Sequence, residues 1–481
     1  MARLSPLQRK MKLKSPSASV KQKRAQVQVD VELVTLPVGK HIDIELENLS
    51  HDGRGVGRWQ GKAVFVKGAL QGEWVKAEVL SDHKSHAEAG ILEIKRQSES
   101  RVEAICPVYE TCGGCQLQHL DPKEQVGFKQ SAIAEQLRRL ADIEPQAWVQ
   151  PIAEGSDGYR RRAQLATRYF SDSNTLLMGF RQSGHKHIVP IDQCPVLESE
   201  LSALLAPLHK VLLSVSQTQL VTHIELLQAQ NSPCISLKIS AALDAEDQQL
   251  LCEFAIQQGT NLVCQQSGQA DLWLHGSVEQ LYYTLDMPSS SYNAMSSDKL
   301  TLDFAVNDFV QVNAGANQAM VAQALNWLEL NANDQVLDLF CGVGNFALPI
   351  AKYAQHGVQV LAIEGDYSMV EQGRKNAHKN AINNVDFHHA DLFEAKARSL
   401  WKKKTINKVL LDPPRAGAKG IAQLLKGQPL ERVVYVSCHP ASMARDLKEF
   451  QALGLKVAKM GCIDMFPHTT HLEVMALLVP K

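Results

Sequence analysis

Apolar and polar residues alternate along the first part of the chain, from about Val31 to Ile94. The stretches HIDIELENLS and GEWVKAEVL alternate residue by residue, and repeated glycines interrupt the segment between them, DGRGVGRWQGKAVFVKGAL. A period of two predicts strands that bury one face. About five short strands with glycine corners predict a small β-barrel of the OB type.

The pattern changes from about Phe304 onward, where short apolar runs alternate with helical periodicity. The expected strands are QVLDLFC, QVLAIEG, VDFHHAD, KVLLDPP, RVVYVSC and LEVMALLV, and the expected helices include QAMVAQALNWLEL and SMVEQGRKNAHKNA. This alternation predicts an α/β domain with a mostly parallel sheet and helices on both faces. Such sheets bind ligands just outside the carboxyl ends of their strands.

The periodicity is weaker between these two parts. Residues 96–120 are loop-like, and a helix is expected over 121–142, with Asp121 as N-cap and Val126, Ile133, Leu137 and Leu140 at helical spacing. A mixed α/β region follows, with RAQLATRYF, TLLMGFR, CISLKIS and DLWLHG as strands. The predicted regions are therefore a basic tail (1–29), a barrel (30–95), a central domain (96–303) and an α/β domain (304–481).

Composition and charge fit a multidomain globular protein. A chain of 481 residues with 45% hydrophobic and 21% charged residues predicts two to four domains. The apolar runs are too short to span a membrane and the start of the chain has no signal-peptide core, so a cytoplasmic protein is expected. Residues 1–29 contain eight Lys or Arg and no acid, which fits a solvated tail and a nucleic-acid-binding arm equally well.

Three of the strand ends carry candidate chemistry. In DLFCGVGNFALP, Gly342 and Gly344 allow close approach to a ligand, and a helix is expected to begin near Asn345. Glu364 follows the next strand, where it would accept hydrogen bonds from ribose hydroxyls. These features fit both a dinucleotide and S-adenosylmethionine. Asp391 and the segment Asp412-Pro-Pro-Arg, at further strand ends, favour methyl transfer, because a dehydrogenase has no evident need of this segment.

Cys438 ends the apolar run VVYVSC. A buried core thiol is the plain alternative, but the position and the nearby Asp412 favour a nucleophile whose pKa we expect to be partly lowered. A thiolate that adds to C6 of a pyrimidine makes C5 able to attack a methyl sulfonium. Glu473, at the start of a largely apolar strand and after His468 and His471, is the candidate base for the C5 proton, with its basicity raised by burial.

A second set of cysteines has metal-ligand spacing. Cys106, Cys112 and Cys115 form C-x5-C-G-G-C, and Cys194 is a possible fourth ligand. Four thiolates suit a [4Fe–4S] cluster or structural zinc, and the Gly-Gly pair favours the bulkier cluster. Two groups of side chains are expected to bind RNA: Arg160, Arg161, Arg162, Arg168, Arg181, Lys186 and His187 in the central domain, and Arg54, Arg58, Trp59 and Lys67 on the barrel.

Taken together, FVQVN, DLFCGVGNF, LLDPPR, VSCHPASMARD and HTTHLE resemble the RNA uracil-C5-methyltransferase family in order and spacing, from about residue 30 onward. The barrel resembles a TRAM domain, and barrel plus cysteine set resemble the branch that acts on 23S rRNA. The resemblance implies a Rossmann-like fold, S-adenosylmethionine as methyl donor and a [4Fe–4S] cluster. It also implies that the helix after the cysteine loop packs on the catalytic domain in some members.

The resemblance assigns roles to individual residues. It implies Cys438 as nucleophile and Glu473 as proton acceptor; cofactor contacts from Gln311, Phe340, Asn345, Glu364, Asp391 and Asp412; and cluster ligation by Cys106, Cys112, Cys115 and Cys194. One departure is His439, where the family usually has Asn. We expect a monomer that methylates 23S rRNA without an obligate protein partner. The alternatives are a tRNA uridine C5-methyltransferase and a noncatalytic iron–sulfur RNA-binding protein.

Overall fold

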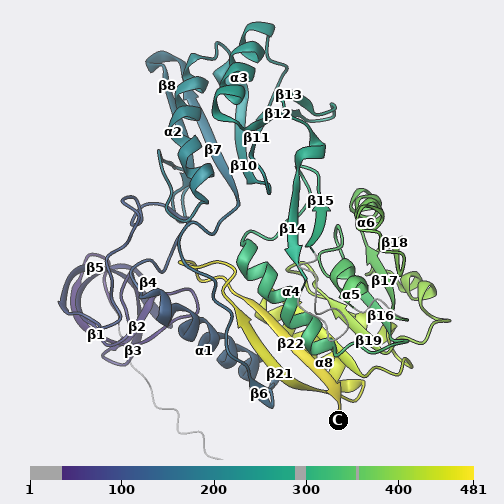
Figure 1. Ribbon diagram of the computed structural model, residues 1–481. Coiled ribbons are helices and arrows are strands. Elements are labelled where there is room, and N and C mark those ends of the chain that lie inside the picture. Colours follow the sequence, from purple (N-terminus) through teal and green to yellow (C-terminus); the bar gives the residue numbers. More distant parts are fainter. Residues whose placement is uncertain (1–34, 288–298, 354–356) are drawn as a thin grey trace, which may run out of the picture.

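The computed structural model describes residues 35–287, 299–353 and 357–481, so the predicted basic tail lies outside the described residues. Figure 1 shows a small barrel (purple), a central α/β part (blue to teal) and a larger α/β part (green to yellow) that also contains a helix from the blue segment. No helix among the described residues is both long enough and apolar enough to cross a membrane.

The barrel consists of β1 (His41–Leu49), β2 (Gly55–Trp59), β3 (Lys62–Lys67), β4 (Trp74–Asp82) and β5 (His86–Arg96), closed in the order β1-β2-β3-β5-β4. The alternation seen in the sequence is the cause, since Ile42, Ile44 and Leu46 on β1 point into the barrel core and their neighbours face outward. The predicted barrel is thereby confirmed.

The central part is built on a seven-stranded sheet. Its strands are β7 (Arg162–Phe170), β8 (Thr175–Arg181), β9 (Ile188–Pro190), β10 (Val221–Gln228), β11 (Pro233–Ile239), β12 (Asn261–Gln266) and β13 (Leu272–His275), in the order β13-β12-β11-β10-β7-β8-β9. The apolar residues of α2 (Ser199–Ser214) and α3 (Ala245–Gln258) pack on this sheet. The pair β14 (Tyr282–Asp286) and β15 (Lys299–Asp303) leads on to the third part.

The third part contains an eight-stranded sheet in the order β18-β17-β16-β19-β20-β22-β21-β6. Its strands are β16 (Gln335–Leu339), β17 (Gln359–Glu364), β18 (Val385–His389), β19 (Lys408–Leu411), β20 (Arg432–Ser437), β21 (Leu455–Ile463), β22 (Glu473–Pro480) and β6 (Ala147–Trp148), and its helices are α4 (Ala314–Leu328), α5 (Ala347–Tyr353), α6 (Tyr367–Lys379), α7 (Ile421–Leu424) and α8 (Pro440–Ala452). The first five strands in the order are parallel, whereas β22 runs antiparallel to both neighbours. The helices form one core on each face of the sheet, as the sequence predicted.

Two elements from the range predicted for the central domain join this sheet. Helix α1 (Pro122–Ala141) contributes Ile133 and Leu137 to one of the sheet's two cores, and β6 pairs with the edge strand β21. The Lys129 ammonium is buried against Asp464, with 2.7 Å between Nζ and Oδ1. Leu140, by contrast, is exposed. The helix after the cysteine loop thus packs on the C-terminal part in this chain.

Candidate active site

The loops after β16, β17, β18, β19 and β20 meet at one edge of the sheet. Strand β16 lies between β17 and β19, so the strand order reverses at β16: β17 and β18 lie on one side of it, and β19 and β20 on the other. Open α/β sheets form their ligand cleft at such a reversal. Phe340 and Gly342 follow β16, Glu364 ends β17, and Asp412 follows β19.

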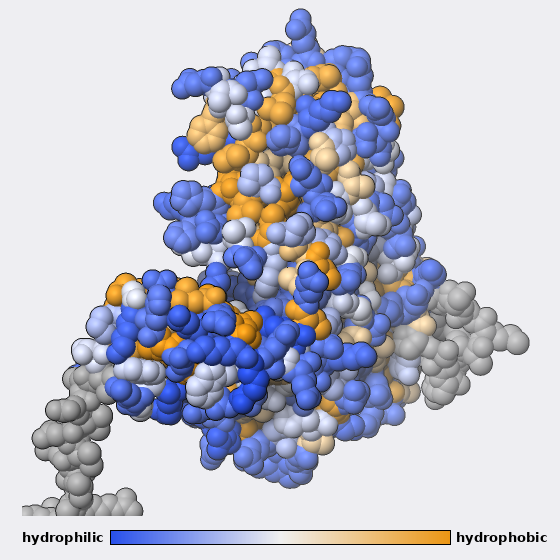
Figure 2. All heavy atoms as spheres, turned by 90° about the vertical axis from the view of Figure 1, so that its left-hand side faces the viewer, coloured by the Kyte–Doolittle hydropathy of each residue, from blue (hydrophilic) through white to orange (hydrophobic). Residues whose placement is uncertain are grey.

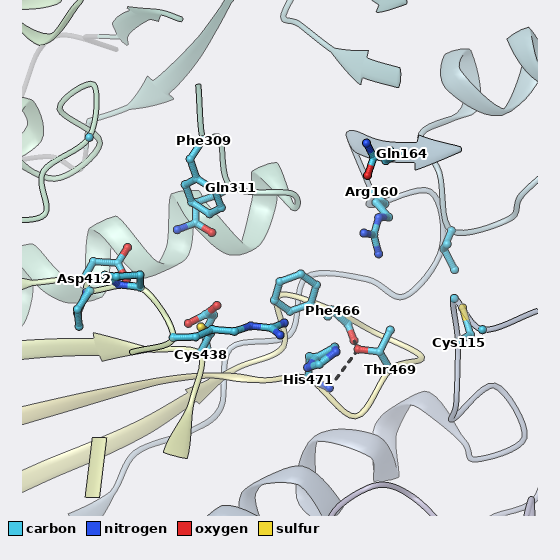
Figure 3. A pocket seen from close by; sticks show the side chains of 18 of the residues that line it. Cys115, Arg160, Gln164, Phe309, Gln311, Asp412, Cys438, Phe466, Thr469 and His471 are labelled. Carbon is cyan, nitrogen blue, oxygen red and sulfur yellow. Dashed lines mark hydrogen bonds between the residues drawn. The ribbon is translucent and has the colours of Figure 1, made fainter. Parts of the chain in front are cut away.

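A cavity of about 1030 Å³ occupies this edge and extends to the cysteine loop (Figure 3). Eleven of the twelve site residues predicted from the sequence line it: Gln311, Phe340, Glu364, Asp391, Asp412, Cys438, Glu473, Cys106, Cys112, Cys115 and Cys194. In Figure 3, Asp412 lies on the side of Cys438 away from Cys115, and Gln311 lies above Cys438. The cysteine loop, Cys194, Gln311 and the strand ends of the sheet, which are far apart in the sequence, therefore share one space.

The glycine turn after β16 is held in an unusual backbone conformation. Phe340, Gly342 and Gly344 all have positive φ, at 63°, 53° and 103°. A Cβ on Gly344 would lie 2.8 Å from Leu348 Cγ, so only glycine fits. The Glu364 carboxylate accepts a hydrogen bond from the Gly342 N–H at 3.0 Å. Glu364 therefore orders the turn and lines the cavity.

Asn345 lies apart from the other predicted residues. Its side chain exchanges two hydrogen bonds of 2.9 Å with Asn317 and accepts a third from the Tyr283 hydroxyl at 3.0 Å. These contacts direct the amide toward α4, and Asn345 does not line the cavity. Helix α5 also begins two residues later than the sequence suggested, at Ala347. In this structure the side chain of Asn345 links the glycine turn to Asn317 on α4 and to Tyr283 on β14.

Strand pairing sets Cys438 opposite Glu473. Ser437 pairs with Val474 across the antiparallel β20–β22 ladder, so the next residue along each strand toward the cavity is Cys438 on one and Glu473 on the other. Cys438 is half-buried, while Glu473 is only 7% exposed. A thiol and a carboxyl group thus face one cavity from neighbouring strands.

The thiol of Cys438 is not activated by its protein surroundings. Burial raises its pKa to about 11, and the charges of Glu473 and Asp412 act in the same direction, while Arg415 opposes them. The expected lowering of this pKa is therefore wrong. Burial is the main reason, because it disfavours the charged thiolate, and the Asp412 and Glu473 charges add to it.

The two carboxyl groups are themselves hard to ionise. Burial raises the pKa of Asp412 to about 7. Burial and then the Asp412 charge raise the pKa of Glu473 well above its usual value, which confirms the expected gain in basicity. Asp338, fully buried within β16, has a raised pKa from burial and from Asp412 and Glu364. This concentration of carboxyl groups favours a cationic ligand.

The two histidines before Glu473 have different positions. His468 is buried; its backbone N–H donates to Gln125 Oε1 at 2.8 Å, and its carbonyl accepts from Gln116 and Leu117. His471 lines the cavity (Figure 3), and its backbone N–H donates to the Thr469 hydroxyl. His468 thus fastens the cysteine loop to the loop before Glu473.

The four predicted ligand cysteines are free thiols that line one end of the cavity. Burial raises the pKa of Cys115 to about 12, and the other three thiols act in the same direction. Gly113 is needed for the tight loop, because a Cβ there would lie 2.7 Å from the Arg181 carbonyl oxygen. Within the described residues, no three of these cysteines have their sulfur atoms all within 4.8 Å of one another.

The predicted arginine surface is only partly available. Arg160 lines the cavity. Arg161 is buried, donates to the Gln311 carbonyl at 2.6 Å and covers the Tyr283 ring. Arg162 pairs with Glu225 at 2.6 Å. Arg161 and Arg162 are thus structural, and the phosphate-contact prediction is wrong for both.

The barrel residues predicted to bind RNA also divide into residues held by other side chains and residues that are exposed. Arg54 is held by Asp52 and Glu88, at 2.9 and 2.8 Å, and stacks on Phe65. The Trp59 ring is covered by the Lys40 ammonium at 4.0 Å. Arg58 and Lys67 remain exposed. Figure 2 shows the side of the molecule on which the barrel lies, with apolar atoms gathered mainly on the central part above it.

Some cavity residues had no role assigned from the sequence. Phe309, 65% exposed, lies two residues before Gln311 at the cavity (Figure 3), and Phe466 and Thr469 come from the loop before Glu473. An aromatic ring that remains exposed at the edge of a cavity is a signal for ligand stacking. The sequence could not provide that signal, because exposure follows from the fold.

Comparison with known proteins agrees with this geometry. The family model described as tRNA (Uracil-5-)-methyltransferase matches residues 122–481, and that of the TRAM domain matches residues 36–92. The 23S rRNA (uracil(1939)-C(5))-methyltransferases RlmD of Shewanella sediminis and Pseudomonas fluorescens are 40% and 41% identical, over 91% and 92% of this chain and 95% and 92% of their own lengths.

A solved structure shares the fold. The Pyrococcus abyssi tRNA (uracil-54, C5)-methyltransferase, in complex with S-adenosyl-L-homocysteine, superposes with a TM-score of 0.67 at 22% identity, covering 91% of this chain and 100% of that one. With the family model matching most of the chain, and with a cysteine and a glutamate facing each other beside the glycine turn, the chain belongs to the uracil-C5 RNA methyltransferase family.

Proposed function

We propose that this protein methylates C5 of one uridine in 23S rRNA through a covalent bond between Cys438 and C6 of the base. The observation that carries the proposal is the placement of Cys438 and Glu473 on facing strands of one cavity. The RlmD relatives, which are similar over nearly the whole chain, favour rRNA over tRNA as substrate. S-adenosylmethionine, when bound, supplies an electrophilic methyl group.

In the proposed reaction the Cys438 thiolate adds to C6, and the electron pair of the C5–C6 bond becomes available at C5. C5 takes the methyl group, and Glu473 then removes the C5 proton. The electrons of that C–H bond restore the C5–C6 double bond as the sulfur leaves. The target base must be unstacked to reach Cys438, at a cost of about a few kcal/mol.

The carboxyl groups of the site explain how a thiol with a raised pKa can react. We propose that Gln311, Phe340, Glu364, Asp391 and Asp412 hold the methyl donor, with Asn345 acting through the glycine turn. The donor carries positive charge, which offsets the negative charges that raise the pKa of Cys438. The thiol is thereby activated only when the donor is present.

We further propose that Cys106, Cys112, Cys115 and Cys194 hold a [4Fe–4S] cluster with a structural or RNA-positioning role. The donor set fits, because four free thiols line one end of the cavity. The Gly-Gly pair between Cys112 and Cys115 leaves room for the bulkier cluster, which supports iron–sulfur over zinc. Iron and sulfide analysis of anaerobically purified Cys194→Ser, with Cys234→Ser as the buried-thiol control, tests it.

The decisive experiment supplies unmodified 23S rRNA and tRNA, separately, with tritiated S-adenosylmethionine. We expect label at C5 of a single rRNA uridine with the unmodified protein and with Cys462→Ala, a control that removes a buried thiol from β21, which β22 separates from β20. Cys438→Ala should give none. Label on tRNA alone would assign the tRNA reaction instead, and binding without label on either RNA would indicate a noncatalytic RNA-binding protein. We propose that the enzyme acts as a cytoplasmic monomer.

A further inference from the structure

A second cavity, of about 390 Å³, adjoins the first. Cys438 and His471 line both cavities. The other walls of the second cavity come from four parts of the chain: the turn between β1 and β2, one face of α1, the start of α8, and the loop before β22. It therefore lies where the barrel, the helix after the cysteine loop and the catalytic sheet meet.

The walls of this second cavity are held in place by contacts behind them. Asp52 is fixed by Arg54 at 2.9 Å and by the Ser50 hydroxyl at 2.5 Å. A Cβ on Gly53 would lie 2.9 Å from Leu117, so the barrel turn packs closely against the cysteine loop. Lys129 is tied to Asp464. The cavity is thus part of the packed structure and needs no rearrangement to form.

The lining of the second cavity contains both aromatic rings and side chains that form hydrogen bonds. Phe128 is half-buried, and the imidazoles of His51, His439 and His471 are exposed. Such rings bind nucleobases by stacking, without demanding one sequence. Asp52 and Gln136 add an acceptor and an amide, the groups that read base edges. The volume lies at the lower end for ligand sites and suits one base.

His439 also presents a hydrogen-bond donor here. Its Nδ1 accepts from the Ser442 N–H at 3.2 Å and so caps α8, which places the ring proton on Nε2. Within the described residues Nε2 has no hydrogen-bond partner. An asparagine, usual in the family at this position, provides the cap but not the extended imidazole. This chain therefore adds a ring to the second cavity.

We propose that the second cavity receives a nucleobase adjacent to the methylated uridine, unstacked together with it. This inference rests on the proposed function, because it requires RNA bound with its target at Cys438. A base extruded to Cys438 brings its neighbours to the edge of the same opening. Since Cys438 and His471 border both spaces, the neighbouring base meets a ready stacking site beside the barrel.

The test uses a short rRNA hairpin containing the methylated uridine, with each flanking nucleotide replaced in turn by an abasic one. Affinity is measured for the unmodified protein, for Phe128→Ala and for Glu135→Ala, an exposed control on the same helix. We expect one flanking position where the abasic RNA binds the unmodified protein and Glu135→Ala about tenfold more weakly, the typical loss for one stacked base. At that position Phe128→Ala should show no difference between abasic and intact RNA.

Equal abasic losses in Phe128→Ala and the unmodified protein at every position would overturn the proposal. Gln136→Ala, which removes little packing, repeats the test if Phe128→Ala does not fold. In a second readout, 2-aminopurine replaces the base at the sensitive position. Its fluorescence should increase when the unmodified protein binds and should not increase with Phe128→Ala. Failure of the proposed function is seen separately, as absence of methylation of the intact hairpin; the scan is then run on the RNA that is methylated.

Discussion

Replacing Asp412 by asparagine should stabilise the ligand-free protein above neutral pH while abolishing methylation. The Asp412 carboxyl lies in a partly covered position after β19, and burial raises its pKa from 3.8 to about 7. A group with a raised folded-state pKa contributes stability that is fully present below pH 3.8 and is lost as the pH rises through about 7. Asparagine has nearly the same shape and never ionises.

The size of the effect follows from the shift. About three pKa units, at 1.36 kcal/mol each, correspond to about 4 kcal/mol for full ionisation. Partial solvent access reduces the figure, so we expect Asp412→Asn to be about 2–4 kcal/mol more stable at pH 8. At pH 4 the two proteins should be nearly equal, because the native carboxyl is then protonated. Thermal unfolding of both proteins between pH 4 and 9 measures this difference, which should amount to several degrees at pH 8.

Two results would refute the reasoning. A stability difference that does not change with pH would mean that the carboxylate is not destabilised by its surroundings. A variant less stable than the unmodified protein at pH 8 would mean that Asp412 is held by favourable contacts in the free protein. Asp386→Asn is the matched control, because Asp386 is exposed on β18 and its replacement should have little effect at any pH.

Three further outcomes are expected. Glu473→Gln should slow turnover by about 10²–10⁴-fold and give a covalent protein–RNA band on denaturing gels. The control Glu431→Gln, at an exposed residue beside the start of β20, should do neither. Turnover of Glu473→Gln within tenfold of normal would exclude Glu473 as the base. The rate at which iodoacetamide alkylates Cys438 should rise with pH toward the thiol pKa of about 11. The reaction should be faster in Asp412→Asn. A rate that does not change between pH 7 and 10 would contradict the raised pKa. Lys129→Met should cost about 3–5 kcal/mol of stability, because Asp464 is left buried without its partner, and adding Asp464→Leu should restore much of it, as measured by urea unfolding.

Local periodicity explains what the sequence could predict. The barrel and the alternation of strands and helices from about residue 304 follow from apolar spacing within each segment, and the site residues at strand ends follow from the parallel order of those strands. Strand β21 had no such signal. Its pairing with β22 shifts between Val457 and Lys459, which interrupts the period of two on which a strand prediction depends.

Side-chain environments were less predictable, because they depend on partners from distant segments. Asn345 is turned from the cavity by Asn317 and Tyr283, which are 28 and 62 residues away. Burial, together with the carboxyl groups of Glu473 and Asp412 from two other strands, raises the pKa of the Cys438 thiol, where the strand-end position alone suggested a fall. In both cases the residue was placed at the right edge of the sheet, and its neighbours there determined its chemistry.

A single buried glutamine illustrates how the predicted parts become one site. Gln125 donates to the carbonyls of Leu117 and Leu120 in the cysteine loop, and its Oε1 accepts from the His468 backbone N–H. A polar residue at this position of α1 reads as solvent-facing, yet it is fully buried. Because an unpaired buried amide is costly, all three hydrogen bonds must form together. The cysteine loop, α1 and the loop before Glu473 are therefore fixed relative to one another, which gives the cysteine loop a direct structural route to the position of the base.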